Sequence, residues 1–112
     1  MGLVNLLRVD SKCVSCKEEI DLLFQFKYGS HQSSYFYLGA QISWGGPQVL
    51  DGEPDVGKVE VEAIAYPCPR CKGQAIIPKY QLIVIENDVL VEIKPNMGQR
   101  PINQEGSYWV LE

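Results

Sequence analysis

The stretch Cys13-Val-Ser-Cys16-Lys-Glu-Glu-Ile-Asp-Leu-Leu-Phe-Gln-Phe-Lys-Tyr28 joins a closely spaced cysteine pair to a segment of regular apolar alternation. Apolar side chains occupy every second position of this segment, at Ile20, Leu22, Phe24, Phe26 and Tyr28. Because side chains alternate between two faces along a strand, the pattern predicts a half-buried β-strand. This strand begins just after the cysteine pair, so strand and cysteines are expected to form one structural unit.

The same kind of pattern recurs further along the chain. Residues 56–66 alternate small apolar with charged side chains and lead into a second cysteine pair, Cys68-Pro-Arg-Cys71. Residues 74–86 and 89–93 are rich in β-branched side chains and flank Asn87-Asp88, which is typical of a tight hairpin turn. No window shows the apolar spacing of three and four residues that an amphipathic helix requires. We therefore expect a mainly β fold with little or no helix.

The long segment between these strands differs in composition. Residues 35–42, Tyr-Phe-Tyr-Leu-Gly-Ala-Gln-Ile, favour a strand, whereas residues 44–55 are dense in turn-forming residues and predict an exposed connection. A chain of 112 residues without a long linker is expected to form one domain. We expect this domain over residues 1–94, with an insertion at about 29–55, and a polar tail over 95–112 for which the sequence allows partial disorder.

The four cysteines fall into two pairs of identical spacing. A Cys-x-x-Cys turn presents two sulfurs to one ion, and two such turns complete the tetrahedral shell of zinc. The spacing thus predicts that Cys13, Cys16, Cys68 and Cys71 bind one Zn²⁺ per chain. Iron is the closest rival, because an Fe(Cys)₄ centre uses the same ligands. A dithiol redox pair would need a thioredoxin-like βαβ context, and disulfides would suit a secreted chain, so both rank lower.

In Cys13-Val-Ser-Cys16-Lys17 and Cys68-Pro-Arg-Cys71-Lys72-Gly73, with the strands expected around them, the chain resembles the zinc-ribbon and rubredoxin-like superfamily. The resemblance covers about half of the chain. It implies two metal-binding knuckles on antiparallel β-hairpins that face each other across one ion. The cysteine pairs are separated by residues 17–67, far more than the roughly 15–20 residues of compact ribbons. The expected inserted β segment therefore lies outside the resemblance.

Charge and hydropathy limit the classes of partner. The chain has 10 basic and 14 acidic residues, a net charge of −4, which disfavours broad attraction to nucleic acid. The basic residues beside the cysteines are expected to offset thiolate charge; they are Lys12, Lys17, Arg70 and Lys72. Apolar runs are too short to cross a bilayer, and no secretory leader is recognisable. We expect no membrane association and a cytoplasmic location.

Few residues suggest chemistry beyond the metal. A closed Cys₄ site has no open coordination position, and the only histidine, His31, lies in a polar loop, so we expect no enzymatic activity. The aromatic group Tyr35, Tyr37 and Trp44 is the candidate binding surface, although such residues also build cores. The leading hypothesis is a structural-zinc β module that binds a protein partner, with a homodimer through strand edges as a further option. The alternatives are a nucleic-acid-associated zinc-ribbon factor and a rubredoxin-like iron electron carrier.

Overall fold

The computed structural model describes residues 4–31, 34–46, 48–102 and 107–111. These residues contain no helix, and a mainly β fold is therefore confirmed. None of them forms a helical segment of the length and apolarity needed to cross a membrane. The strands are β1 (Asn5–Lys12), β2 (Glu19–Phe26), β3 (Gly29–Ser30), β4 (Val49–Asp51), β5 (Lys58–Ala65), β6 (Tyr80–Glu86), β7 (Val89–Pro95) and β8 (Tyr108–Val110).

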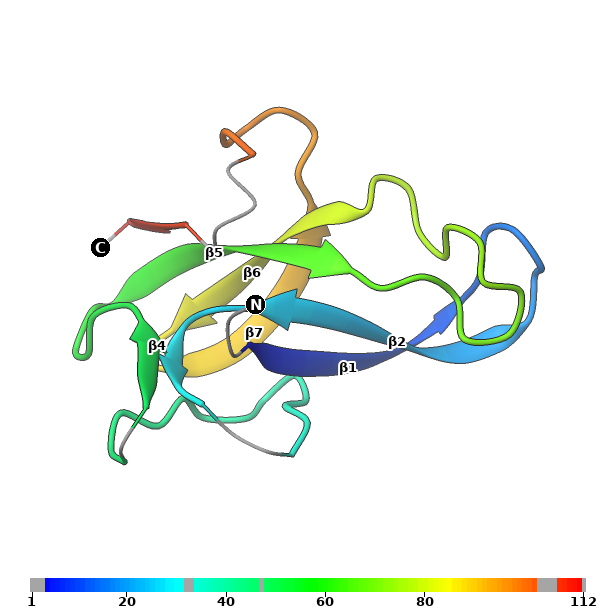
Figure 1. Ribbon diagram of the computed structural model, residues 1–112. Helices are drawn as coiled ribbons and strands as arrows, with labels where there is room; N and C mark the ends of the chain where they lie inside the picture. Colours follow the sequence, from blue (N-terminus) through cyan, green and yellow to red (C-terminus); the bar gives the residue numbers. More distant parts are fainter. Residues whose placement is uncertain (1–3, 32–33, 47, 103–106, 112) are drawn as a thin grey trace.

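Six of the strands form one curled antiparallel sheet. Its order is β1-β2-β5-β6-β7, and β8 adds to the edge of β5 (Figure 1). The β1–β2 and β5–β6 hairpins are joined where Phe24–Phe26 of β2 pair with Ala63–Ala65 of β5. The two hairpins are thus parts of a single sheet, and their cysteine-bearing connections lie at the same end of it, on the right of Figure 1. A second small sheet, β3 with β4, lies within the expected insertion.

Residues 35–42 connect the two outer strands of the sheet. Phe36 exchanges backbone hydrogen bonds with β1, whereas Gly39 and Ala40 exchange them with Leu90 of β7. The continuous strand predicted for this segment is wrong, because only isolated bridges form on either side of a turn at Gly39. The segment crosses from one sheet edge to the other, so it cannot pair with one strand along its length. It covers part of both edges and closes the curled sheet.

The core lies inside this curl. The apolar face predicted for β2 is confirmed, because its alternate side chains, continuing to Tyr28 beyond the strand, are each 7% exposed or less. Phe26 meets Phe36 of the connecting segment edge-on, with ring centroids 5.5 Å apart. Tyr28 meets Trp44 and Tyr108 edge-on at 5.2 and 5.4 Å. The aromatic cluster of Tyr28, Trp44 and Tyr108 therefore attaches the insertion and β8 to the body.

β5 departs from the amphipathic pattern expected for it, because Glu60 is buried on its polar face. The Glu60 carboxylate is 2.7 Å from Lys94 Nζ and 2.9 Å from Arg100 Nε. Arg100 in turn lies over the ring of Trp109 in β8, at 5.4 Å. Burial raises the pKa of Glu60, but the hydrogen bonds from Lys94 and Arg100 outweigh it and hold the pKa below 4.5. This network connects β5, β7 and the C-terminal segment.

Glu60→Gln is expected to lower the free energy of unfolding at pH 7 by about 2 kcal/mol, because two cations lose the carboxylate they share in a partly shielded site. A carboxylate whose pKa is depressed on folding contributes stability above its unfolded value, here 4.5, and loses it as pH falls through the folded value. The difference in the free energy of unfolding between wild type and variant, measured by urea unfolding, should therefore shrink below pH 4.5. Glu92→Gln, at an exposed position of β7, is the control. A gap of constant size at acidic pH would contradict this assignment.

Candidate metal centre

The β1–β2 and β5–β6 connections bring the four cysteines together at one end of the sheet. Their Sγ atoms all lie within 4.8 Å of one another. The Cys13–Cys71 and Cys16–Cys68 sulfur pairs are each separated by 3.8 Å, and all four thiols are free. A tetrahedral ion with Zn–S bonds of about 2.3 Å requires sulfurs about 3.8 Å apart. The spacing therefore fits a four-thiolate metal centre.

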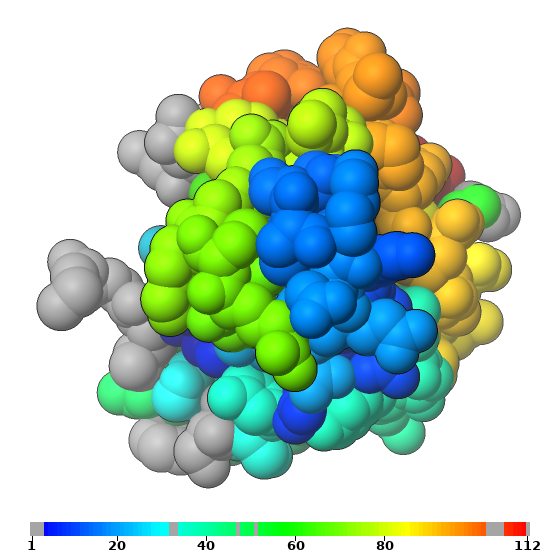
Figure 2. Space-filling view, turned by 90° about the vertical axis from the view of Figure 1, so that its right-hand side faces the viewer, coloured from blue at the N-terminus to red at the C-terminus, as the bar shows by residue number. Residues whose placement is uncertain are grey.

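The two cysteine turns, here called knuckles (residues 13–18 and 68–73), have the same backbone arrangement. In the first, the N–H groups of Ser15 and Cys16 donate to Cys13 Sγ at 3.3 and 3.4 Å. In the second, the corresponding groups of Arg70 and Cys71 donate to Cys68 Sγ at 3.3 and 3.5 Å. The knuckles lie side by side in Figure 2, blue and yellow-green, at the end of the molecule that faces the viewer. In each knuckle, two backbone N–H groups thus stabilise negative charge on the sulfur of the first cysteine.

The clustered thiols affect one another's ionisation. The backbone N–H of Cys16 lowers the pKa of Cys13 from 9.0 to about 6, against the effect of burial. The backbone N–H of Cys71 lowers the pKa of Cys68 in the same way. The N–H of Glu18 lowers the pKa of Cys16, but burial and the neighbouring thiols together raise it to about 11. A divalent cation relieves this conflict, because it allows all four sulfurs to be deprotonated at once.

The four thiols differ in their access to solvent. Cys13 and Cys68, the first cysteine of each knuckle, are 1% and 0% exposed, whereas Cys71 is exposed and Cys16 is intermediate. Ser15 Oγ donates to the carbonyl of Gln74 at 2.8 Å and links the first knuckle directly to the chain after the second. The site is therefore closed at Cys13 and Cys68, partly accessible at Cys16 and open at Cys71.

The predicted aromatic surface is divided by the structure. Tyr35 and Tyr37 are 45% and 52% exposed, and both lie near Arg8, whose guanidinium is 5.5 Å from the Tyr35 ring centroid. The pKa of Arg8 is raised by its hydrogen bond with Asp21, with a smaller contribution from Tyr37. Trp44 is only partly exposed and packs on Tyr28. Of the three predicted residues, Tyr35 and Tyr37 therefore remain a candidate binding surface, and Trp44 does not.

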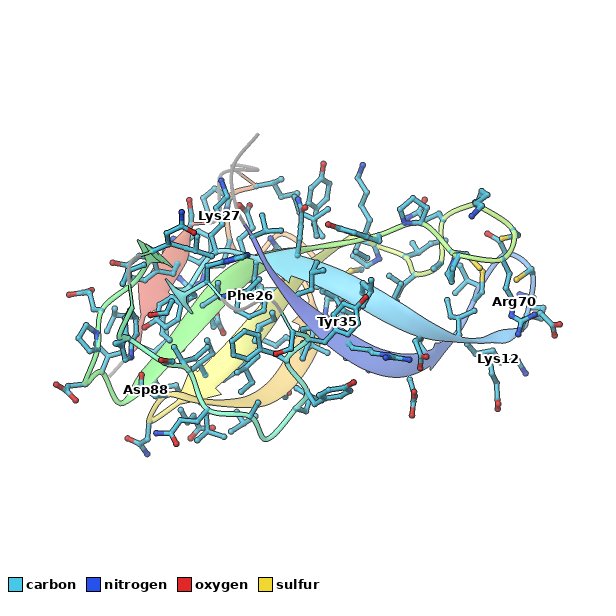
Figure 3. The ribbon with its side chains drawn as sticks, turned by 60° about the horizontal axis from the view of Figure 1, so that its bottom comes forward. Lys12, Phe26, Lys27, Tyr35, Arg70 and Asp88 are labelled. Atoms are coloured by element: carbon cyan, nitrogen blue, oxygen red, sulfur yellow. The ribbon has the colours of Figure 1, made fainter. Side chains whose placement is uncertain are left out.

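A groove of about 480 Å³ runs from Tyr35, one of these two tyrosines, to the second knuckle. Tyr35 and Arg8 line one part of it, Pro69 and Arg70 line another, and Leu23 lies among its apolar residues. Figure 3 shows Arg70 at the end that carries the sulfur atoms and Tyr35 further along the β1–β2 hairpin. Pro69 and Arg70 are the two residues between Cys68 and Cys71, so a metal ion would also fix one side of this groove.

Some residues of the site were not identified from the sequence. Arg8 was not connected with the tyrosines, because their proximity depends on the pairing of Phe36 with β1. Lys17 and Lys72 were predicted only to offset charge, although the repeat Cys-x-x-Cys-Lys could have indicated a common conformation. Both adopt the left-handed conformation, with φ of 66° and 64°.

No known protein family, curated protein or solved structure matches the chain. Its class is therefore defined by its own geometry: a mainly β protein with four cysteines close enough together to hold a metal ion. This arrangement is compatible with a zinc ribbon.

Proposed function

We propose that the four cysteines bind one structural zinc ion and that the chain is a non-enzymatic module that binds a protein partner. The observation that carries the proposal is the 3.8 Å spacing of the sulfurs across the two knuckles, which suits tetrahedral zinc. Four thiolates fill such a shell and leave no position for a substrate, which supports a structural role. The same argument supports the proposed absence of enzymatic activity.

A structural ion would act beside a short junction of the sheet. β1 and β2 share eight paired positions and β5 and β6 share seven, whereas β2 and β5 share three. The knuckles lie on the connections of these two hairpins, where Ser15 Oγ and the Val14 N–H already donate to the carbonyls of Gln74 and Ala75. An ion between the knuckles would strengthen this junction. Apparent zinc-binding free energies in small peptides, about 10–16 kcal/mol, are comparable to the stability of a whole domain.

The contacts of the basic residues favour a protein partner over nucleic acid. Lys17 Nζ donates to the carbonyl of Val14 at 2.8 Å, and Lys72 Nζ donates to that of Pro69 at 3.1 Å. Two of the four basic side chains of this end are therefore engaged within their own knuckles. The groove beside them also contains the carboxylates of Glu19 and Asp21, which would repel phosphates. Exposed tyrosines next to a groove are typical of protein recognition.

The partner hypothesis is tested by selecting random peptides on the zinc-loaded protein. Peptides that bind the groove should bind at least about tenfold more weakly to the double variant Tyr35→Ala/Tyr37→Ala, because the aromatic contact area is lost. Zinc content should be unchanged in that variant. Val110→Ala, which shortens an exposed apolar side chain of β8, is the control and should bind normally. Failure to select any peptide, or equal binding by the tyrosine variant, would contradict the proposal.

Three further measurements test the alternatives. Salt-sensitive binding of a labelled single-stranded RNA, abolished by Lys12→Glu and Arg70→Glu, would support a nucleic-acid factor instead. Visible absorbance of freshly purified protein would indicate iron and an electron carrier. Sedimentation at several concentrations tests the homodimer.

A further inference from the structure

Each cysteine pair is followed by a lysine in a conformation that glycine adopts more easily. Lys17 and Lys72 have φ of 66° and 64°, a region that costs a non-glycine residue roughly 1–2 kcal/mol. Their backbone N–H groups donate to the carbonyls of Cys13 and Cys68 at 3.0 and 2.9 Å. The knuckle geometry therefore requires a left-handed residue here but does not require a lysine.

The lysine side chains have a repeated contact as well. Each Nζ donates to the carbonyl of the residue after the first cysteine of its own knuckle, Val14 or Pro69. The four-carbon chain thus folds back over the cysteine turn and places its ammonium against the backbone of its own knuckle. Lys12 and Arg70 make no ion pair within the described part of the chain, and no such internal contact fixes their side chains. The same arrangement occurs in both knuckles, on segments far apart in sequence.

We propose that Lys17 and Lys72 control how tightly the centre holds its ion. This inference rests on the proposed zinc binding. A zinc ion with four thiolates has a formal charge of −2, and one ammonium per knuckle neutralises it. The ammoniums offset the charge of the thiolates around the ion and so oppose its release. Because both lysines are exposed, salt screens this effect.

The test measures the rate at which the zinc-loaded chain of 112 residues transfers zinc to the chelator 4-(2-pyridylazo)resorcinol. Lys17→Gln/Lys72→Gln removes both charges and should release zinc about tenfold faster at low ionic strength. The difference should shrink in 1 M salt. Lys17→Arg/Lys72→Arg keeps the charges and should release zinc slowly. Lys79→Gln, which removes an exposed lysine outside the knuckles, is the control.

A glycine variant separates charge from backbone conformation. Lys17→Gly/Lys72→Gly should unfold at a higher temperature than the glutamine variant, because the left-handed conformation no longer carries a cost, yet it should release zinc equally fast. Zinc release at the wild-type rate in the glutamine variant, or acceleration that salt does not reduce, would overturn the role of the lysines. Absence of zinc from the wild-type protein, measured first by elemental analysis, would instead overturn the proposed function itself.

Discussion

Cys68→Ser is expected to abolish stoichiometric zinc binding and to lower the free energy of unfolding by about 5 kcal/mol or more. Cys68 is fully buried and accepts two backbone N–H groups, so its sulfur has the most constrained position in the second knuckle. A serine hydroxyl is a poor zinc ligand, and three remaining thiolates no longer complete the shell that would hold the two knuckles together. Thermal unfolding and zinc content of the purified variant measure the effect.

The loss of stability in Cys68→Ser should appear first where β2 pairs with β5. The Tyr66 N–H donates to the Leu23 carbonyl at 2.8 Å just beyond the three paired positions of these strands, next to the second knuckle. Its amide hydrogen should exchange faster in the Cys68 variant than amides within the β5–β6 hairpin. Arg70→Ser, in the same knuckle, is the matched control and should keep both zinc and stability. An unchanged unfolding midpoint in Cys68→Ser would show that the centre is not structural.

Gly52→Ala is expected to destabilise the opposite part of the molecule, by about 3 kcal/mol, without loss of zinc. A Cβ atom at this position would lie 2.5 and 2.6 Å from ring atoms of Tyr28 and 2.8 Å from Trp44. The Tyr28 ring is fully buried, and its hydroxyl donates to the Glu53 carbonyl at 3.0 Å, so it cannot move away easily. The backbone φ of +106° adds strain for any residue with a Cβ.

Gly98→Ala is the matched control for this prediction. Gly98 has nearly the same φ, +104°, but a Cβ there would meet no atom within 4 Å. The control should therefore show only the cost of backbone strain, about 1 kcal/mol. Urea unfolding of both variants with zinc bound measures the difference. Equal losses for Gly52→Ala and Gly98→Ala would contradict the close packing of the aromatic cluster.

The parts of the fold that depend on local pattern could be predicted from the sequence. Alternation identified β2, and the turn at Asn87 and Asp88, both of which have positive φ, separates β6 from β7 as expected. The candidate metal ligands were also found by local spacing, because each knuckle is a short turn whose two cysteines face the same way. In these cases the chemistry of a few neighbouring residues determines the structure.

The parts that depend on distant contacts could not be predicted. Residues 35–42 have strand-forming side chains, but Phe36 and Leu90 hold the segment across two sheet edges, which its own sequence does not reveal. Burial of Glu60 depends on Lys94 and on Arg100, 40 residues further along the chain. The candidate surface was similarly reduced to Tyr35 and Tyr37, because Trp44 finds a packing partner in Tyr28.

The central claim is that a zinc ion holds the two knuckles together. Elemental analysis of the freshly purified protein tests it most directly, because it counts zinc and iron per chain without assuming a function. The account predicts about one zinc per chain and no stoichiometric iron. A folded protein that contains no metal, or one that contains iron in place of zinc, would contradict it.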